Sequence, residues 1–151
     1  MDMVKTLADL TSAFGPSGCE QEISQVIEGL AKPYVDEMSR DVMGNLICRR
    51  KGSGPRVMFS AHMDSLGLVA THIDEKGFVH VGAVGGVHPA EVLYTPVRFQ
   101  NGVRGLVCAP EDADMSKLKV TDLLIDLGAA DREEAEKQVQ VGDVAVYDTV
   151  T

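Results

Sequence analysis

The stretch at residues 55–67 limits the possible folds of the chain more than any other, because a short apolar run there leads straight into a histidine and an aspartate. The run at residues 57–61 is typical of a strand buried on both faces of a parallel or mixed α/β sheet. His62 and Asp64 follow at the carboxyl end of this expected strand. Open α/β sheets bind ligands in the crevice beyond such strand ends. The stretch therefore predicts an α/β sheet with a candidate site at His62 and Asp64.

The spacing of His62 and Asp64 favours a metal site. Residues two apart in an extended chain point the same way, so the Asp64 carboxylate can lie near the His62 ring. A carboxylate that accepts the proton of one ring nitrogen leaves the other nitrogen free to bind a metal ion. The alternative is a strand-end histidine capped by a loop aspartate, since two residues make only a fragment of a metal site.

Length, charge and cysteine content exclude several classes of protein. A chain of 151 residues is long enough for one ordinary domain or two small ones. The net charge of -9 argues against a nucleic-acid or anionic-membrane partner. Cys19, Cys48 and Cys108 are odd in number and far apart, as expected of small core residues in a reducing compartment. No stretch approaches the ~20 apolar residues of a membrane span, and the start lacks the apolar core of a signal peptide. We therefore expect a cytoplasmic protein.

Two helices are expected at the start of the chain. Apolar residues recur at helical spacing over residues 3–14, and again up to Ala31. Ser17 and Glu20 stand three apart just before the second helix. This pattern predicts a capping box, in which the serine hydroxyl and the glutamate carboxylate bind free backbone amides at the helix start.

Two strands are expected next, over residues 34–40 and 46–50, joined by a turn at residues 41–45. With the strand expected at residues 57–61, the order is helix, helix, strand, strand, strand. This order is typical of the beginning of an α/β layer.

After Gly67 the pattern changes to short strands joined by tight turns. Asp74–Gly77 and Asn101–Gly102 are hairpin turns by composition, and Asp131 is expected to cap a helix of about two turns. The expected strands cover residues 68–73, 78–84, 96–100, 103–109, 123–127 and 144–147. Such a series predicts a small barrel or sandwich. The fold class expected is thus α/β plus all-β, with an α/β portion at residues 1–65 and a small β-barrel at residues 66–151.

Two further groups of residues carry weaker signals. His72 and His80 lie on the two arms of the first expected hairpin, but a one-residue change of register decides whether they share a face. No carboxylate or cysteine is expected nearby to complete a metal site, which favours surface histidines. The acidic stretch Glu111–Asp114 lacks the spacing of a calcium loop and is more typical of a solvated turn.

Several segments together resemble the amino-terminal half of the tetrahedral aminopeptidases, a family of dinuclear-metal peptidases that includes the glutamyl and deblocking aminopeptidases. The resemblance covers essentially the whole chain. The segments that carry it, in order, are Leu10–Glu20, Asp41–Asn45, Ala61–Asp64 with Gly67, Asp74–Gly77, Val84–Gly86, Leu123–Ala135 and Val141–Asp143.

The resemblance implies an α/β peptidase domain interrupted by a small PDZ-like β-barrel that serves dimerisation, with dimers assembling into a tetrahedral dodecamer. It implies that His62 is a metal ligand and that Asp64 is the catalytic-site carboxylate that orients the His62 ring. The implied cofactors are two divalent metal ions, zinc or cobalt, and the implied substrate is a peptide from which the amino-terminal residue is removed.

The chain departs from the family in length, since family members continue well past the point where this sequence stops. Their bridging aspartate, their glutamate base and their other ligands lie in that further portion. A zinc ion needs three or four ligands, and this chain offers His62 alone. We therefore expect the chain by itself to hold neither ion and to be inactive.

Three hypotheses remain open on the sequence. The first is a metallo-aminopeptidase represented by its amino-terminal half. The second is a non-catalytic interaction module that uses the barrel to dimerise or to bind a peptide by strand addition. The third is a hydrolase completed by a second chain that supplies the missing ligands.

Overall fold

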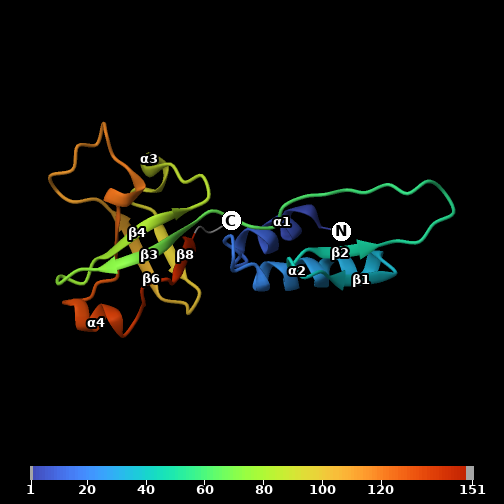
Figure 1. Cartoon of the computed structure of the whole chain (residues 1–151), viewed down its shortest axis with the longest axis horizontal. Helices are drawn as coiled ribbons and strands as arrows, with labels where there is room; N and C mark the ends of the chain where they lie inside the picture. The colour runs from blue at the N-terminus through green and yellow to red at the C-terminus, as the bar shows by residue number, and fades with distance from the viewer. Residues whose placement is uncertain (1, 149–151) are drawn as a thin grey trace. The chain divides into compact units, whose positions relative to one another are not determined.

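The computed structural model describes residues 2–148, and the chain divides between Asp64 and Ser65 into two compact units. Figure 1 shows the helices and the small sheet of the first unit and the strands of the second. The elements of the first unit are α1 (Met3–Ser12), α2 (Gln21–Ala31), the 3₁₀ turn η1 (Lys32–Tyr34), β1 (Glu37–Arg40) and β2 (Leu46–Arg49).

The first unit contains the expected pair of helices and the expected hairpin. Asp2 caps α1 by accepting hydrogen bonds from the backbone amides of Val4 and Lys5. Strands β1 and β2 pair antiparallel in a two-stranded sheet, with Glu37 opposite Arg49. The core of this unit is small, because few of its side chains are buried, among them Phe14, Ile23 and Ser24.

The strand expected at residues 57–61 is absent, and that prediction was wrong. Residues 50–64 form no helix or strand, and Val57, Met58 and Phe59 are 74%, 87% and 94% exposed. A strand that is buried on both faces needs neighbouring strands and covering helices. In the described part of this unit the sheet has only β1 and β2, which pair with each other. The apolar run is therefore a long extended segment, visible in green in Figure 1.

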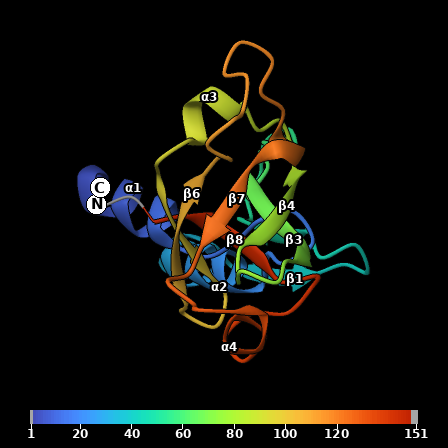
Figure 2. The same cartoon turned by 90° about the vertical axis from the view of Figure 1, so that its left-hand side faces the viewer.

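The second unit is a closed barrel of six strands, all paired antiparallel, in the order β3-β4-β7-β6-β5-β8. Figure 2 shows this unit from the side of its short helices and loops. Its elements are β3 (Gly67–Ile73), β4 (Val79–Val84), α3 (Pro89–Val92), β5 (Pro96–Phe99), β6 (Arg104–Cys108), the 3₁₀ turn η2 (Val120–Asp122), β7 (Leu124–Asp126), α4 (Arg132–Glu136) and β8 (Val144–Tyr147). The expected small barrel is confirmed.

Alternation along the strands builds the barrel core. Successive side chains of a strand point to opposite faces, so every second residue turns inward. The short helices and loops add Val92, Leu123, Ala135 and Val139 to this core. The buried strand residues are Leu68, Ala70, Ile73, Val79, Val81, Val97, Phe99, Val107, Ile125 and Ala145. Each strand of the described barrel pairs with a neighbour on both sides, and β4 pairs with β7 at Val79 and His80.

The turns of the barrel follow from their residues. Asp74 accepts hydrogen bonds from the amides of Lys76 and Phe78, and Gly77 adopts a φ of +84° that favours glycine. Asp131 accepts from the amide of Glu134 and caps α4, as expected. The short helix α3 and the turn η2 were not expected from the sequence.

Candidate metal centre

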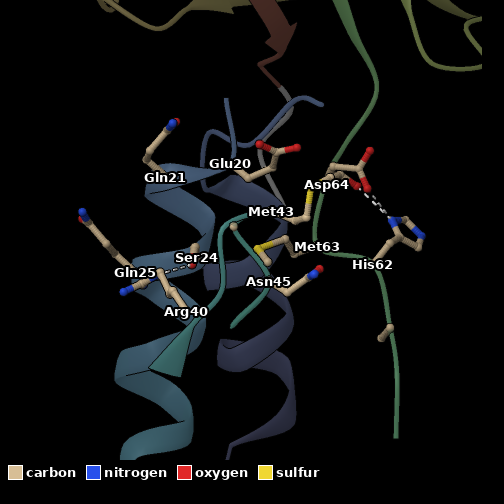
Figure 3. A pocket seen from close by; sticks show the side chains of 12 residues that line it. Glu20, Gln21, Ser24, Gln25, Arg40, Met43, Asn45, His62, Met63 and Asp64 are labelled. Carbon is tan, nitrogen blue, oxygen red and sulfur yellow. Dashed lines mark hydrogen bonds and ion pairs between the residues drawn. The ribbon is translucent and has the colours of Figure 1, made fainter. Parts of the chain in front are cut away.

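His62 and Asp64, the two site residues predicted from the sequence, lie in contact (Figure 3). Nδ1 of His62 is 3.1 Å from both Oδ1 and the backbone oxygen of Asp64. Because both oxygens are acceptors, Nδ1 must carry the proton and donate it. The lone pair of the neutral ring is then on Nε2, and the His62 side chain is 86% exposed. The arrangement presents one imidazole nitrogen ready to coordinate a metal ion.

Ser17 completes this arrangement, and sequence reasoning missed that role. Its hydroxyl donates a hydrogen bond to Oδ2 of Asp64. This bond, followed by the contact with His62, holds the pKa of the Asp64 carboxyl below its usual range. No local pattern could have found the pair, since 47 positions separate the two residues.

The predicted capping box is wrong. The N-cap of α2 is Glu20, and its side chain makes no hydrogen bond to the start of the helix. Oε1 of Glu20 instead accepts from the amide of Gly18, at 2.8 Å, while the hydroxyl of Ser17 goes to Asp64. Both side chains that the pattern assigned to the helix start therefore stabilise the preceding turn and the candidate site.

A cavity of about 350 Å³ adjoins the pair within the first unit. Figure 3 shows the side chains around it. Arg40 on its wall is held by an ion pair with Glu28, at 2.6 Å, and by a hydrogen bond to Ser24, at 3.1 Å. The lining residues are Glu20, Gln21, Ser24, Gln25, Arg40, Met43, Gly44, Asn45, Ala61, His62, Met63 and Asp64. The wall thus combines polar side chains with an equal share of apolar surface, to which two methionine side chains contribute.

The described residues can supply one ligand of a metal ion but not a complete metal site. Within residues 2–148, no group of three or more histidine, cysteine, aspartate or glutamate side chains is arranged to hold a metal. Zinc sites take three or four ligands. His62 suits the part of a single imidazole ligand, because Asp64 fixes the proton on its other nitrogen.

His72 and His80 do share a face of the barrel, a question that the sequence left open. A register shift between Ala70 and His72 places the two histidines opposite each other, with ring centroids 5.4 Å apart. The expectation of no nearby carboxylate was wrong, because Oδ2 of Asp74 lies 3.5 Å from Nε2 of His80. Nη2 of Arg132 lies 3.4 Å from Nε2 of His72. The positive guanidinium makes this cluster a poor place for a cation.

The acidic stretch Glu111–Asp114 forms a turn. Oδ1 of Asp114 accepts hydrogen bonds from the amide and the hydroxyl of Ser116, at 3.0 and 2.6 Å. The bonds to Ser116 hold the pKa of Asp114 below its ordinary value. Among the described helices, none is long and apolar enough to cross a membrane.

Comparison with protein families and curated proteins gives a consistent result. A family model described as M42 glutamyl aminopeptidase matches residues 44–151. A "putative aminopeptidase" of Acetivibrio thermocellus is 44% identical and covers 97% of this chain and 44% of its own length. A lysyl aminopeptidase of Pyrococcus furiosus is 37% identical over 88% of this chain and 42% of its own. The chain thus spans less than half the length of these relatives.

Solved structures agree with this result. Aminopeptidase APDkam598 of Desulfurococcus kamchatkensis has a TM-score of 0.87 at 36% identity, over 96% of this chain and 43% of that one. The TET1 peptidase of Pyrococcus horikoshii, described as able to assemble into a tetrahedron or a large octahedral shell, has a TM-score of 0.84 at 32% identity. It aligns over 97% of this chain and 47% of its own.

Proposed function

Because the chain belongs to the M42 glutamyl aminopeptidase family, we propose that it forms the amino-terminal portion of a metal-dependent aminopeptidase, which removes amino-terminal residues from peptides. The observation that carries this proposal is the contact between His62 and Asp64, in which Nδ1 of the ring lies 3.1 Å from both Oδ1 and the backbone oxygen of Asp64. The named relatives, putative and lysyl aminopeptidases, support the same reaction class.

In this proposal His62 is a metal ligand and Asp64 is the catalytic-site carboxylate that orients it. The proposed cofactors are two divalent ions, zinc or cobalt, both of which accept imidazole and carboxylate ligands. Since residues 2–148 offer one such ligand and no complete set, the remaining ligands must come from outside them. We therefore expect the 151-residue chain alone to hydrolyse no peptide.

We further propose that residues 1–65 belong to the peptidase domain and that the barrel at residues 66–151 is a PDZ-like dimerisation domain. The description of the Pyrococcus horikoshii neighbour as a tetrahedral or octahedral assembly supports a homo-oligomer. The barrel would associate through side chains, because its described strands form a closed ring. The net charge and cysteine content support a cytoplasmic protein without a nucleic-acid or membrane partner.

A chimera tests the proposed function. Residues 1–151 would replace the matching segment of the Acetivibrio thermocellus relative, which supplies the rest of the polypeptide. We expect about two metal ions per chain by elemental analysis and release of amino-terminal residues from short peptides. His62→Ala should lower metal content and reduce activity by about 100-fold or more, whereas His88→Ala, in the loop before α3, should change neither.

Two results would contradict the proposal. One is a folded, metal-loaded chimera that releases no amino acid from any peptide. The other is a His62→Ala chimera with full metal content and full activity. The isolated 151-residue chain serves as the reference for a protein with an incomplete ligand set.

A further inference from the structure

We propose that Ser17 is a positioning residue for the candidate metal centre: its hydroxyl fixes the Asp64 carboxylate so that His62 keeps its proton on Nδ1 and its lone pair on Nε2. A role of Ser17 in catalysis rests on the proposed function. The arrangement itself is a property of the metal-free chain and can be measured there.

The two oxygens of Asp64 bind different donors. Oδ2 accepts from the hydroxyl of Ser17, and Oδ1 accepts from Nδ1 of His62 at 3.1 Å. The terminal torsion of an aspartate is broad and roughly two-fold, so one bond alone fixes the carboxylate plane poorly. A second bond, to the opposite oxygen, removes this freedom. Ser17 therefore orients the acceptor that holds the proton of His62.

The turn that carries Ser17 is stiff. Pro16, which is fully buried, has a fixed φ, and its carbonyl accepts from the amide of Cys19 at 2.8 Å. Gly18 has a φ of +91°, and its amide donates to Glu20. Proline, a left-handed glycine and two hydrogen bonds leave the Ser17 backbone little freedom.

The same turn is packed directly on α2. Phe14 is fully buried, and its amide donates to Oε1 of Glu22 at 2.9 Å. A Cβ atom at Gly15 would lie 2.3 Å from Cγ2 of Ile23, so the backbone approaches the helix as closely as glycine allows. The position of the Ser17 hydroxyl is thus set by a buried contact with a helix.

The segment that carries His62 and Asp64 lacks comparable support of its own. Residues 50–64 form no helix or strand, and the His62 side chain is largely exposed. A side chain on such a segment is positioned by its contacts rather than by backbone pairing.

The experiment measures the tautomer of His62 in the full chain without metal. Long-range ¹H–¹⁵N correlation at about pH 8, where an ordinary imidazole is neutral, reports the ratio of the Nδ1–H to the Nε2–H form. We expect the Nδ1–H form to dominate in the wild type, and Ser17→Ala to lower the ratio about fivefold, the net worth of one hydrogen bond. Asp64→Ala sets the value for loss of the carboxylate, with the backbone oxygen of that residue, also 3.1 Å from Nδ1, left as the remaining acceptor.

Two matched variants separate positioning from a general loss of structure. Ser17→Thr keeps a hydroxyl and should restore the wild-type ratio. Ser24→Ala removes a hydroxyl that contacts Arg40 instead of Asp64, and should leave the ratio unchanged. In an Asp64→Ala background, Ser17→Ala should have no further effect, because the group through which it acts is gone.

Three outcomes would overturn the inference: an unchanged ratio in Ser17→Ala, an equal effect of that change with and without Asp64, or a lowered ratio in Ser17→Thr. If Ser17→Ala disturbs the turn itself, seen in the amide resonances of residues 14–20, the Ser17→Thr result decides. None of these measurements depends on metal or activity. A chimera that hydrolysed nothing would therefore refute the proposed function and leave this inference standing.

Discussion

Aspartate carboxylates that bind nearby backbone amides recur along this acidic chain. Asp2 does so at the start of α1, Asp41 between β1 and β2, Asp74 between β3 and β4, and Asp131 before α4. In each case an oxygen accepts from amides two to four residues ahead, which fixes a turn or a helix start. For Asp41 and Asp74, hydrogen bonds of this kind hold the pKa of the carboxyl below its ordinary value. Some of the negative charge of the chain therefore belongs to aspartates that stabilise turns and helix starts.

Asp41 offers the clearest test of this use. Its carboxylate accepts from the side-chain amide of Asn45, at 2.8 Å, and from the backbone amides of Asn45 and Met43, at 2.9 and 3.0 Å. These bonds, the Asn45 side chain first, hold the pKa of Asp41 below its ordinary 3.8. Because the folded pKa is depressed, the stabilisation is present above pH 3.8 and is lost as the pH falls through the folded value.

We expect the amide resonances of Met43 and Asn45 to titrate with a midpoint below pH 3.8. Asn45→Ala should move that midpoint upward, towards the ordinary value. A wild-type midpoint at or above 3.8, or no change in the variant, would show that the hydrogen bonds do not stabilise the ionised form.

At the scale of the elements, sequence patterns correctly predicted the structures that depend on residues close together in the chain, such as hairpin turns. Asn101–Gly102 and Asp74–Gly77 form their hairpins in the barrel, since the turn chemistry and the alternation of the flanking strands lie within a few residues. The run at residues 57–61 failed as a strand because burial on both faces depends on partners elsewhere. The hydroxyl of Ser17 was misassigned for a similar reason: its pattern fits a helix cap, and its partner lies 47 positions away. The bulge that pairs His72 with His80 has no clear sequence signal either.

Two left-handed glycines of these hairpins allow a controlled prediction. Gly77 and Gly102 have φ values of +84° and +89°. A Cβ atom at Gly77 would lie 2.8 Å from the carbonyl oxygen of Asp131, which accepts from Ala135 in α4, whereas one at Gly102 would meet nothing within 4 Å. Gly102→Ala should cost about 1 kcal/mol from the backbone conformation alone, and Gly77→Ala about 2–3 kcal/mol with the added clash.

Native-state hydrogen exchange of the β4 amides measures the stability of the barrel separately from that of the first unit. The method suits this chain because the sequence has no tryptophan whose fluorescence could report unfolding. Equal losses in the two variants would contradict a steric role for the Asp131 carbonyl.

At the scale of the whole chain, the two units differ in how fully they bury their apolar residues. The barrel has a closed core, while the first unit leaves Val57, Met58 and Phe59 in water. Exposed apolar runs of this kind are sites of association. The metal-ligand count and the apolar run both support the proposal that residues outside the first unit complete it.

Replacing Met58 and Phe59 by lysine should reduce self-association of the chain. Burying one large apolar side chain stabilises an interface by about 1.5–3 kcal/mol, so losing two should weaken association about 100-fold or more. Light scattering over a concentration series measures the effect. Val141→Lys, at a barrel residue that is 62% exposed, is the control and should leave association unchanged. Unaltered scattering in the double variant would show that the exposed apolar run at residues 57–59 does not mediate self-association.

Strands β3 and β8 are neighbours in the barrel, with Leu68 opposite Ala145 and Val69 opposite Val144. The first and last strands of the barrel are therefore only about 5 Å apart where they pair. A gene could gain or lose this entire cassette at one point with little disturbance to the flanking polypeptide, since a few residues would bridge the gap. Recombination between genes could likewise exchange one barrel for another at the same two closely spaced chain ends.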